Sequence, residues 1–174
     1  MTVLGCSSAR LRLRPCTLAD APFILRLLTD PAWLRWIGDK GVATLDDARR
    51  YLHSGPLAMY AEHGFGLLRV NAVDGDEPLG VCGLLKRDYL DAPDLGFAFL
   101  PEGRGHGYAT EAATAVLAQA GNVLGIARVL AITAAGNHRS EATLTRLGFQ
   151  PDGQLTPPGS AIALNRFLRK LASP

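Results

Sequence analysis

Two kinds of hydrophobic pattern follow one another along the chain and predict a mixed α/β fold. Short apolar or alternating segments, typical of strands, occur at RLRLRP, FGLLRVNA, LGVCGLLKRD, DLGFAFLP, RVLAIT and AIALNRFL. Longer segments between them repeat apolar residues every three or four positions, as amphipathic helices do. The predicted order is a strand, two helices, three strands, a helix, a strand, a helix and final strands, with a strand–helix–strand crossover at the centre.

The first helix is predicted from its start and stop signals. Asp20 is favoured over Thr17 as its N-cap, because Pro22 then falls in the first turn, where the missing N–H costs nothing. Pro31 is expected to mark the end of this helix. The prediction therefore places one helix between the opening strand and the next capping signal.

The second helix is predicted from a capping-box-like start. Thr44 stands three residues before Asp47, so each side chain can bond the backbone N–H of the other. Leu45, Ala48 and Leu52 then fall on one side of the helix. A second helix is therefore predicted here.

The second half of the chain carries clearer signals. Asp74 and Gly75 indicate a hairpin between two apolar segments. Apolar residues between 109 and 124 repeat at three and four positions and predict the clearest helix of the chain. A short helix follows, capped by Asn137 and closed by Gly148.

Composition is that of a soluble globular protein, and the length suits a single domain, residues 1–174. Hydrophobic residues make up 48% and charged residues 20%, with a net charge of +2. This balance argues against a dominant nucleic-acid-binding face, and Arg10, Arg12 and Arg14, which alternate along one strand, are interpreted as a solvated face. We expect no nucleic-acid partner and a monomer or homodimer.

The cysteines and histidines predict neither disulfides nor a metal site. Cys6, Cys16 and Cys82 are odd in number and widely spaced, and the histidines show no metal-ligand spacing. Reduced thiols are typical of cytoplasmic proteins. The N-terminus has no apolar core of signal-peptide length, and no apolar run approaches the ~20 residues of a membrane span. We therefore expect a cytoplasmic protein without metal or membrane.

The stretch PEGRGHGYATEA, residues 101–112, places Gly103, Gly105 and Gly107 just before the clearest helix. The first N–H groups of a helix lack internal partners and the helix dipole favours negative charge, so bare backbone here indicates an anion site. A Walker loop requires a Lys-Ser/Thr pair that is missing, and dinucleotide spacing fails at Tyr108 and at Thr110. A glycine cluster alone is also consistent with a tightly packed turn.

A different spacing matches a known family. Arg104-x-x-Gly107-x-Ala109 resembles the Arg/Gln-x-x-Gly-x-Gly/Ala motif with which GNAT acetyltransferases grip the pyrophosphate of acetyl-CoA. GYATEA is similar to the form in the ribosomal-protein-alanine acetyltransferase branch, as are RLRLRPCTLADAPFILRLLTDP, CGLLKRDYLDAPDLGFAFLP and NHRSEATLTRLGF. The resemblance spans residues 10–150. It implies a GNAT-type α/β (α+β) fold, with a mixed, mostly antiparallel sheet of about six to seven strands and about four helices.

The resemblance implies that acetyl-CoA is the cosubstrate and binds at the glycine-rich loop. The backbone of Phe99 and Leu100 is expected to pair with the pantetheine arm as an added strand would, and Asn137 to bond the same arm. The pyrophosphate is expected to accept from the backbone N–H groups of Arg104, Gly105, His106, Gly107, Tyr108 and Ala109. His106 stands where the family often has Lys or Arg.

The resemblance also implies direct transfer, in which an amine attacks the thioester while both substrates are bound. Many members protonate the leaving thiolate with a tyrosine after the fifth strand; this chain has none there, and Ser140 stands at the branch's serine position. Asp94 is the candidate base, acting through water, with Asp91, Glu102 and Glu111 as alternatives. An amine that arrives neutral needs no base.

The acceptor stays open. Trp33, Trp36 and Tyr51 lie on or between the first two predicted helices, where the family forms one wall of the acceptor cleft, but their spacing equally suits core or lid packing. The acceptor could be a protein N-terminus, a lysine, a polyamine, an amino sugar or an amino acid. The leading hypothesis is an acyl-CoA-dependent N-acetyltransferase; the alternative is a non-catalytic CoA-binding or regulatory domain of the same fold.

Overall fold

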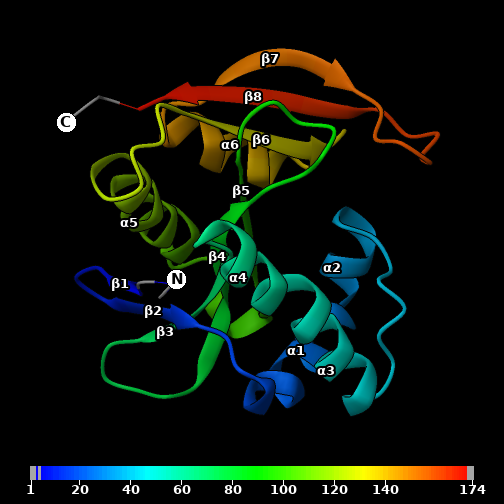
Figure 1. Cartoon of the computed structure of the whole chain (residues 1–174), viewed down its shortest axis with the longest axis vertical. Helices are drawn as coiled ribbons and strands as arrows, with labels where there is room; N and C mark the ends of the chain where they lie inside the picture. Colours follow the sequence, from blue (N-terminus) through cyan, green and yellow to red (C-terminus); the bar gives the residue numbers. More distant parts are fainter. Residues whose placement is uncertain (1–2, 4, 172–174) are drawn as a thin grey trace.

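The computed structural model describes residues 3 and 5–171 and contains one mixed sheet (Figure 1). Its eight strands lie in the spatial order β1-β2-β3-β4-β5-β6-β8-β7. They are β1 (Cys6–Ser7), β2 (Leu11–Pro15), β3 (Leu67–Ala72), β4 (Pro78–Leu85), β5 (Asp94–Phe99), β6 (Arg128–Ala134), β7 (Gln150–Leu155) and β8 (Leu164–Lys170). Only the β5–β6 pair is parallel among these described strands, so the predicted mostly antiparallel sheet is confirmed, with slightly more strands than expected.

The α-helices of the described residues are α1 (Ala21–Leu28), α2 (Pro31–Trp36), α3 (Leu45–Leu52), α4 (Ala58–His63), α5 (Tyr108–Asn122) and α6 (His138–Arg146). Two 3₁₀ turns, η1 (Leu18–Asp20) and η3 (Pro101–Gly103), precede α1 and the glycine-rich loop. A π-helical segment, η2 (His53–Leu57), joins α3 to α4. The predicted crossover is confirmed, since β5, α5 and β6 follow one another and the two strands are parallel.

Two apolar layers sandwich the sheet, because alternate residues of each strand face opposite sides. Cys82 and Leu84 of β4 join the core beneath α5, together with residues of β2, β3 and β6. Val81, which precedes Cys82 and faces the opposite side of the sheet, joins the second core with the buried faces of α1, α2 and α3. Figure 1 shows α5 on one side of the sheet and α1 to α3 gathered on the other.

The start of α3 follows the prediction. The N–H of Asp47 donates to the Thr44 hydroxyl at 3.1 Å, and the N–H of Thr44 donates to the Asp47 carboxylate at 2.8 Å. Ala48 and Leu52 are fully buried, but Leu45 is 42% exposed. Ala48 and Leu52 thus belong to the core shared with α1, whereas Leu45 lies at the exposed start of α3.

Asp20 is the N-cap residue of α1 and Pro22 lies in the first turn, as predicted, but the Asp20 side chain does not cap the helix. Its carboxylate, 3% exposed, accepts instead from the guanidinium groups of Arg14 and Arg69 and from the N–H of Thr17. Burial alone would raise the pKa of Asp20, but these hydrogen bonds outweigh it and lower the pKa to about 2. Asp20 therefore anchors the start of α1 to β2 and β3 through an ion-pair cluster.

The first helix ends just before Pro31, as predicted, but Pro31 also begins a further helix that the sequence did not reveal. Helix α1 ends at Leu28, and α2 starts at Pro31 with Asp30 as its N-cap, whose carboxylate accepts from the N–H of Ala32 at 3.0 Å. Proline suits the first helical position as well as the region beyond a helix, because its missing N–H is unpaired in both places. Both roles apply here, so the proline signal alone did not reveal α2, whose Trp33 is buried in one core with residues of α1 and α3.

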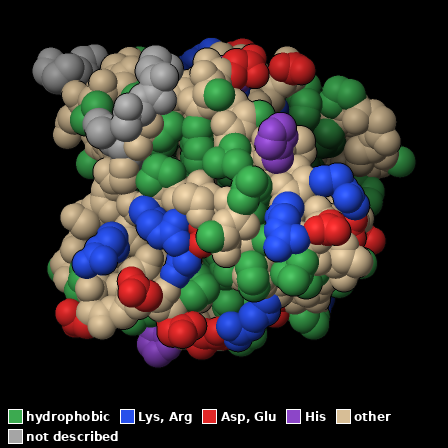
Figure 2. Space-filling model, turned by 60° about the horizontal axis from the view of Figure 1, so that its bottom comes forward, with side chains coloured by type: hydrophobic (Ala, Val, Ile, Leu, Met, Phe, Trp, Pro, Cys, Tyr) green, Lys and Arg blue, Asp and Glu red, His purple; other side chains and the backbone are tan. Residues whose placement is uncertain are grey.

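The surface carries charges of both signs in close alternation. On the face shown in Figure 2, basic and acidic side chains lie beside one another and form no broad field of one sign. Within residues 3 and 5–171, no helix combines the length and the apolar character that crossing a membrane requires.

Candidate functional site

The candidate site lies where β5 and β6 separate. Asp94 and Leu130 form the single register pair between these strands in the described residues, and the N–H of Leu130 donates to the carbonyl of Pro93 at 2.9 Å. Beyond that pair the two parallel strands diverge toward their C-terminal ends. Helices α5 and α6 each begin near those ends, so two helix N-termini border the opening.

A cleft of about 580 Å³ occupies this opening. Four segments line it: the end of α1 with α2, the last residues of β5, the glycine-rich loop with the start of α5, and one face of α6. Of the predicted coenzyme-binding residues, the cleft is lined by Phe99, Arg104, Gly105, Gly107, Tyr108, Ala109 and Asn137, and Ser140 also lines it. The fold thus brings most of the predicted site to one place.

The edge of β5 presents alternate residues to the cleft. The N–H of Leu100 donates to the carbonyl of Leu79 at 2.9 Å, and the carbonyl of Leu100 accepts from the N–H of Gly103 at 2.9 Å. Because backbone groups of successive strand residues point to opposite edges, Phe99 and Phe97 direct theirs toward the cleft. Of the predicted pair, Phe99 is placed to bond a ligand, whereas the backbone of Leu100 is already satisfied within the chain.

The glycine-rich loop presents a row of backbone donors. The N–H of Arg104 donates to the carbonyl of Pro101 at 3.2 Å. From Gly105 to Thr110, the N–H groups have no acceptor among the described residues, and the first bond of α5 is donated by Glu111 to the carbonyl of Gly107. Gly105 and Gly107 adopt φ values of 79° and 78°, which side chains disfavour, so glycine is what lets the loop turn this way.

Arg104 is bonded within the protein. Its Nε donates to the carbonyl of Phe99 at 2.9 Å, and its terminal nitrogen donates to the Asp30 carboxylate at 2.5 Å. The same Asp30 oxygen caps α2. Arg104 therefore ties the glycine-rich loop to β5 and α2, and its side chain acts on the shape of the cleft more than on a bound anion.

Arg10 also holds the loop, although the sequence indicated only a solvated face. Its guanidinium donates to the carbonyl of His106 at 3.0 Å and to the Glu111 carboxylate at 2.7 Å, and it lies 4.8 Å from the ring centre of Tyr108. His106, a predicted coenzyme residue, is exposed, contacts the Tyr108 ring at a tilt and does not line the cleft. Since Arg10 and His106 lie far apart in the sequence, no local pattern could have paired them.

Asn137 and Ser140 lie together at the start of α6. The Asn137 side chain accepts from the N–H of Ser140 at 3.3 Å and so caps the helix. The hydroxyl of Ser140 is half-buried, lines the cleft and has no partner in the part of the chain that the structure describes. A free hydroxyl at this place can donate a proton to a group bound between β5 and β6.

Asp94 does not reach the cleft. Its carboxylate is 1% exposed and forms a double contact with Nε of Arg87, at 3.1 Å to each oxygen. Burial raises the pKa of Asp94, while Arg87 opposes that shift. The carboxylate lies at the closed end of the β5–β6 junction, where its backbone pairs with Leu130.

The other candidate bases are also ion-paired outside the cleft. Asp91 contacts Arg128, Glu102 contacts Arg26, and Glu111 contacts Arg10. Among the described residues lining the cleft, the one carboxylate is that of Asp30. No sequence pattern singled out Asp30, because it precedes a proline that was interpreted as a helix end.

The aromatic residues divide between the cleft and the core. Trp33 and Trp36 of α2 line the cleft with Ile37, opposite Phe97. Tyr51 instead packs against the core formed by α1 and α3, where burial raises its pKa to about 12. Helix α2 therefore supplies an apolar wall close to the free edge of β5.

The described residues contain no group of three or more His, Cys, Asp or Glu side chains that could hold a metal ion. Cys82, predicted to be a small core residue, is fully buried in β4, and burial raises the pKa of its thiol. The polar groups that line the cleft are backbone N–H groups, arginine side chains, the Asp30 carboxylate, the side chains of Asn137 and His138, and the hydroxyls of Tyr108, Thr110, Ser140 and Thr143.

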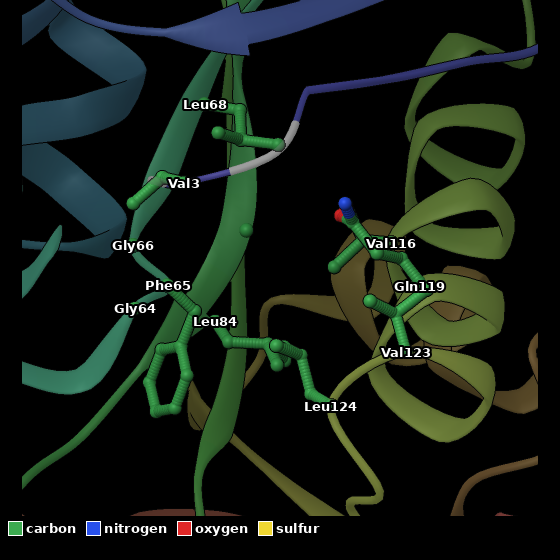
Figure 3. Close-up of a pocket in the computed structure, with 11 residues that line it drawn as sticks. Val3, Gly64, Phe65, Gly66, Leu68, Leu84, Val116, Gln119, Val123 and Leu124 are labelled. Carbon is green, nitrogen blue, oxygen red and sulfur yellow. The ribbon is translucent and has the colours of Figure 1, made fainter. Parts of the chain in front are cut away.

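A second hollow, of about 170 Å³, lies between β3, β4 and the far end of α5. Figure 3 shows Val116 of α5 and Val123, just beyond its end, on one side, with Phe65, Leu68 and Leu84 on the other. The side chains that line it are almost all apolar, in contrast to the first cleft.

Comparisons with known proteins agree with this geometry. The Acetyltransferase (GNAT) domain model matches residues 10–150. The chain is 26% identical over 148 residues to the uncharacterized N-acetyltransferase YoaA of Bacillus subtilis, covering 84% of this chain and 82% of that protein.

Solved structures share the fold. An acetyltransferase from Agrobacterium tumefaciens matches with a TM-score of 0.81 and 24% identity over 97% of this chain and 95% of that one. RimL, a ribosomal L7/L12 alpha-N-protein acetyltransferase in complex with coenzyme A, matches with a TM-score of 0.80 and 18% identity, covering 94% and 96%. At these identities the structures support the fold alone, whereas the family model covers most of the sequence. The chain belongs to the GNAT acetyltransferase family.

Proposed function

We propose that this protein transfers an acetyl group from acetyl-CoA to a primary amine by direct attack within a ternary complex. The observation that carries the proposal is the row of backbone N–H groups from Gly105 to Ala109. They lie at the N-terminus of α5, have no acceptor among the described residues, and border the opening between β5 and β6. Such a row binds a diphosphate through hydrogen bonds and the helix dipole.

The pantetheine arm fits the gap between the strands. Phe99 directs its backbone toward this gap, and its N–H is the donor left after its carbonyl has accepted from Arg104. Asn137, across the gap on α6, completes the contacts. An extended chain of amides laid between diverging strands thus bonds to β5 as a neighbouring strand would.

Transfer then requires four events. The amine nitrogen bonds to the thioester carbon, the carbon–sulfur bond breaks, the amine loses a proton and the sulfur gains one. The N–H of Phe97, directed into the cleft, is placed to stabilise the oxyanion. The Ser140 hydroxyl donates the proton to sulfur and recovers one from water.

No dedicated base is assigned. Asp94 is buried against Arg87, and Asp30, the carboxylate that lines the cleft, is bonded to Arg104 and to the N–H of Ala32. The amine therefore enters as the neutral form or loses its proton to water. This predicts that the rate rises with pH toward the pKa of the acceptor amine, since only the neutral amine attacks.

The cleft favours an amine beside an apolar group. Trp33, Trp36 and Ile37 form the wall nearest the free edge of β5, and Asp30 is already neutralised by Arg104. A polycationic acceptor such as a polyamine would find no free carboxylate among the described lining residues. Peptide N-termini and small amines with apolar substituents are therefore the first acceptors to test.

The test is an amine screen that measures release of free thiol from acetyl-CoA, with acetyl-CoA alone as the blank. Peptides with free N-termini, amino acids, amino sugars and polyamines form the panel, and calorimetry with CoA, ATP and NAD measures binding separately. Amine-dependent thiol release supports the proposal. Binding of CoA without turnover on any amine favours the alternative, a non-catalytic CoA-binding domain; binding of ATP or NAD in preference to CoA contradicts both.

A further inference from the structure

Two arginines in the cleft stand out because they lack partners. Most arginines of the described chain are paired with a carboxylate, as Arg14 is with Asp20 and Arg87 with Asp94. Arg139 and Arg146 both line the cleft, and neither side chain has a hydrogen bond or ion pair among the described residues. Guanidinium groups without carboxylates, collected in a cleft, are suited to bind an anion.

The two side chains belong to one stripe of α6. Arg139, Thr143 and Arg146 are spaced by four and three residues, so they lie on one face of the helix, and all three line the cleft. Across the cleft stand Tyr108, Ala109 and Thr110 at the start of α5. The groove between the two helices is therefore basic on one wall and rich in backbone N–H groups on the other.

The ends of this stripe differ in their distance from Ser140. Arg139 is its neighbour in sequence, whereas Arg146 lies six residues further, about 9 Å along the helix axis. Coenzyme A carries its thiol at one end and a ribose 3′-phosphate monoester beyond the pyrophosphate. If the thiol lies beside Ser140, as the proposed function requires, the 3′-phosphate lies at the distant end of the groove.

We infer that Arg146 binds the ribose 3′-phosphate of the coenzyme, so that this chain discriminates coenzyme A from its 3′-dephospho form. This inference rests on the proposed function, because it assumes that the thiol end lies at Ser140. Arg139, close to the thiol end, does not contribute to the discrimination. Thr143 lies between the two arginines, and its hydroxyl already donates to the carbonyl of Arg139 at 3.1 Å, so we assign it no bond to the phosphate.

The experiment measures the dissociation constants of CoA and 3′-dephospho-CoA for the full-length protein by calorimetry, with the Arg146→Ala, Arg146→Lys, Arg139→Ala and Arg49→Ala variants. The wild type should bind CoA about five- to tenfold more tightly than dephospho-CoA. Arg146→Ala should weaken the binding of CoA to the affinity of dephospho-CoA and leave the dissociation constant of dephospho-CoA unchanged. Arg146→Lys should keep part of the difference, and raised salt should reduce it, because the groove is open to solvent.

The controls separate position from charge. Arg139→Ala removes a cation from the same face of α6, and Arg49→Ala removes one from α3, where Arg49 pairs with Asp46 outside the cleft. Both should preserve the ratio of the two constants, and a thermal melt of each variant establishes that it is folded. The assignment is overturned if Arg146→Ala weakens the binding of CoA and dephospho-CoA equally. It is also overturned if Arg139→Ala, and not Arg146→Ala, changes the ratio of the two dissociation constants. Either result leaves the proposed function intact. Failure of the wild type to bind either coenzyme overturns both.

Discussion

The two hollows of the molecule use glycine for opposite purposes. In the cleft, Gly105 and Gly107 have positive φ, and an added Cβ would meet no protein atom closer than 3.6 Å. Beside the apolar hollow, Gly66 and Gly83 have ordinary φ, but a Cβ on Gly83 would overlap the carbonyl oxygen of Gly66. Glycine in the cleft gives the backbone a shape that exposes its N–H groups, whereas glycine beside the hollow lets β3 and β4 pack closely.

This difference predicts which positions affect stability and which affect the ligand. Substitutions in the first pair should change binding with little change in folding, and substitutions in the second pair should do the reverse. The expected effects below run from the largest to the smallest.

Gly83→Ala should give the largest effect, and on stability. The new methyl group overlaps the Gly66 carbonyl and approaches Cα of Leu67, so β3 and β4 must move apart. We expect a loss of about 3 kcal/mol and a fall in Tm of about 10 °C, measured by thermal denaturation. The CoA dissociation constant of the protein that remains folded at low temperature should stay within about twofold. A normal Tm together with weakened CoA binding would reverse the proposed division between the hollows.

Ser140→Ala should slow acetyl transfer by about ten- to a hundredfold while keeping CoA affinity and Tm. The hydroxyl has no partner to lose among the described residues, but it is placed to protonate the leaving sulfur. Steady-state kinetics with an acceptor from the amine screen measures the rate, and Ser54→Ala, in η2, is the matched control. Equal rates for the wild type and Ser140→Ala would remove Ser140 from the mechanism.

Gly105→Ala should weaken CoA binding about tenfold and lower stability by about 1 kcal/mol, because alanine resists positive φ and narrows the approach to the N–H groups. Gly125→Ala is the matched control: Gly125 also has positive φ and open space around it, but it lies beyond the other end of α5. Calorimetry and thermal melts on both variants should give similar losses of stability and a loss of affinity for Gly105→Ala alone. Similar affinities would show that the loop does not contact the coenzyme.

Val116→Ile should have the smallest effect and the opposite sign. Val116 is buried and faces the apolar hollow, so one more methylene group there adds about 0.8 kcal/mol of burial and about 2 °C in Tm. CoA affinity should be unchanged. A lower Tm would mean that the hollow has no room for the added group.

Local patterns predicted the elements well where one signal had one meaning. The repeat from 109 to 124 gave α5, the capping box gave the start of α3, and the hairpin at Asp74 and Gly75 gave β3 and β4. Pro31 was correctly interpreted as marking the end of α1, but the start of α2 at the same residue was missed, because proline suits the start of a helix as well as the region after one. The N-cap position of Asp20 was predicted, but its ion pair with Arg69 was not, because Arg69 lies on β3, far away in the sequence.

The sequence motifs predicted which segments line the candidate cleft. They did not predict the contacts between residues that lie far apart in the sequence. The positions of Gly105, Gly107 and Ser140 follow from the loop and the helix that carry them. The satisfied backbone of Leu100 depends on the register between β4 and β5, and a shift of one residue would have exposed it in place of Phe99. The burial of Asp94 likewise depends on the parallel strand β6.

The single pair that joins β5 to β6 has a mechanical consequence. Among the described residues, strands β1 to β5 form one half of the sheet, and β6, β8 and β7 form the other. The two halves are joined by the single register pair Asp94–Leu130 and by the helices that pack on the sheet. A molecule bound between β5 and β6 would therefore connect the two halves of the sheet. By mass action, such a ligand at a hundred times its dissociation constant adds about 2.7 kcal/mol to the free energy of unfolding. The Tm of this protein should therefore rise with the concentration of that ligand.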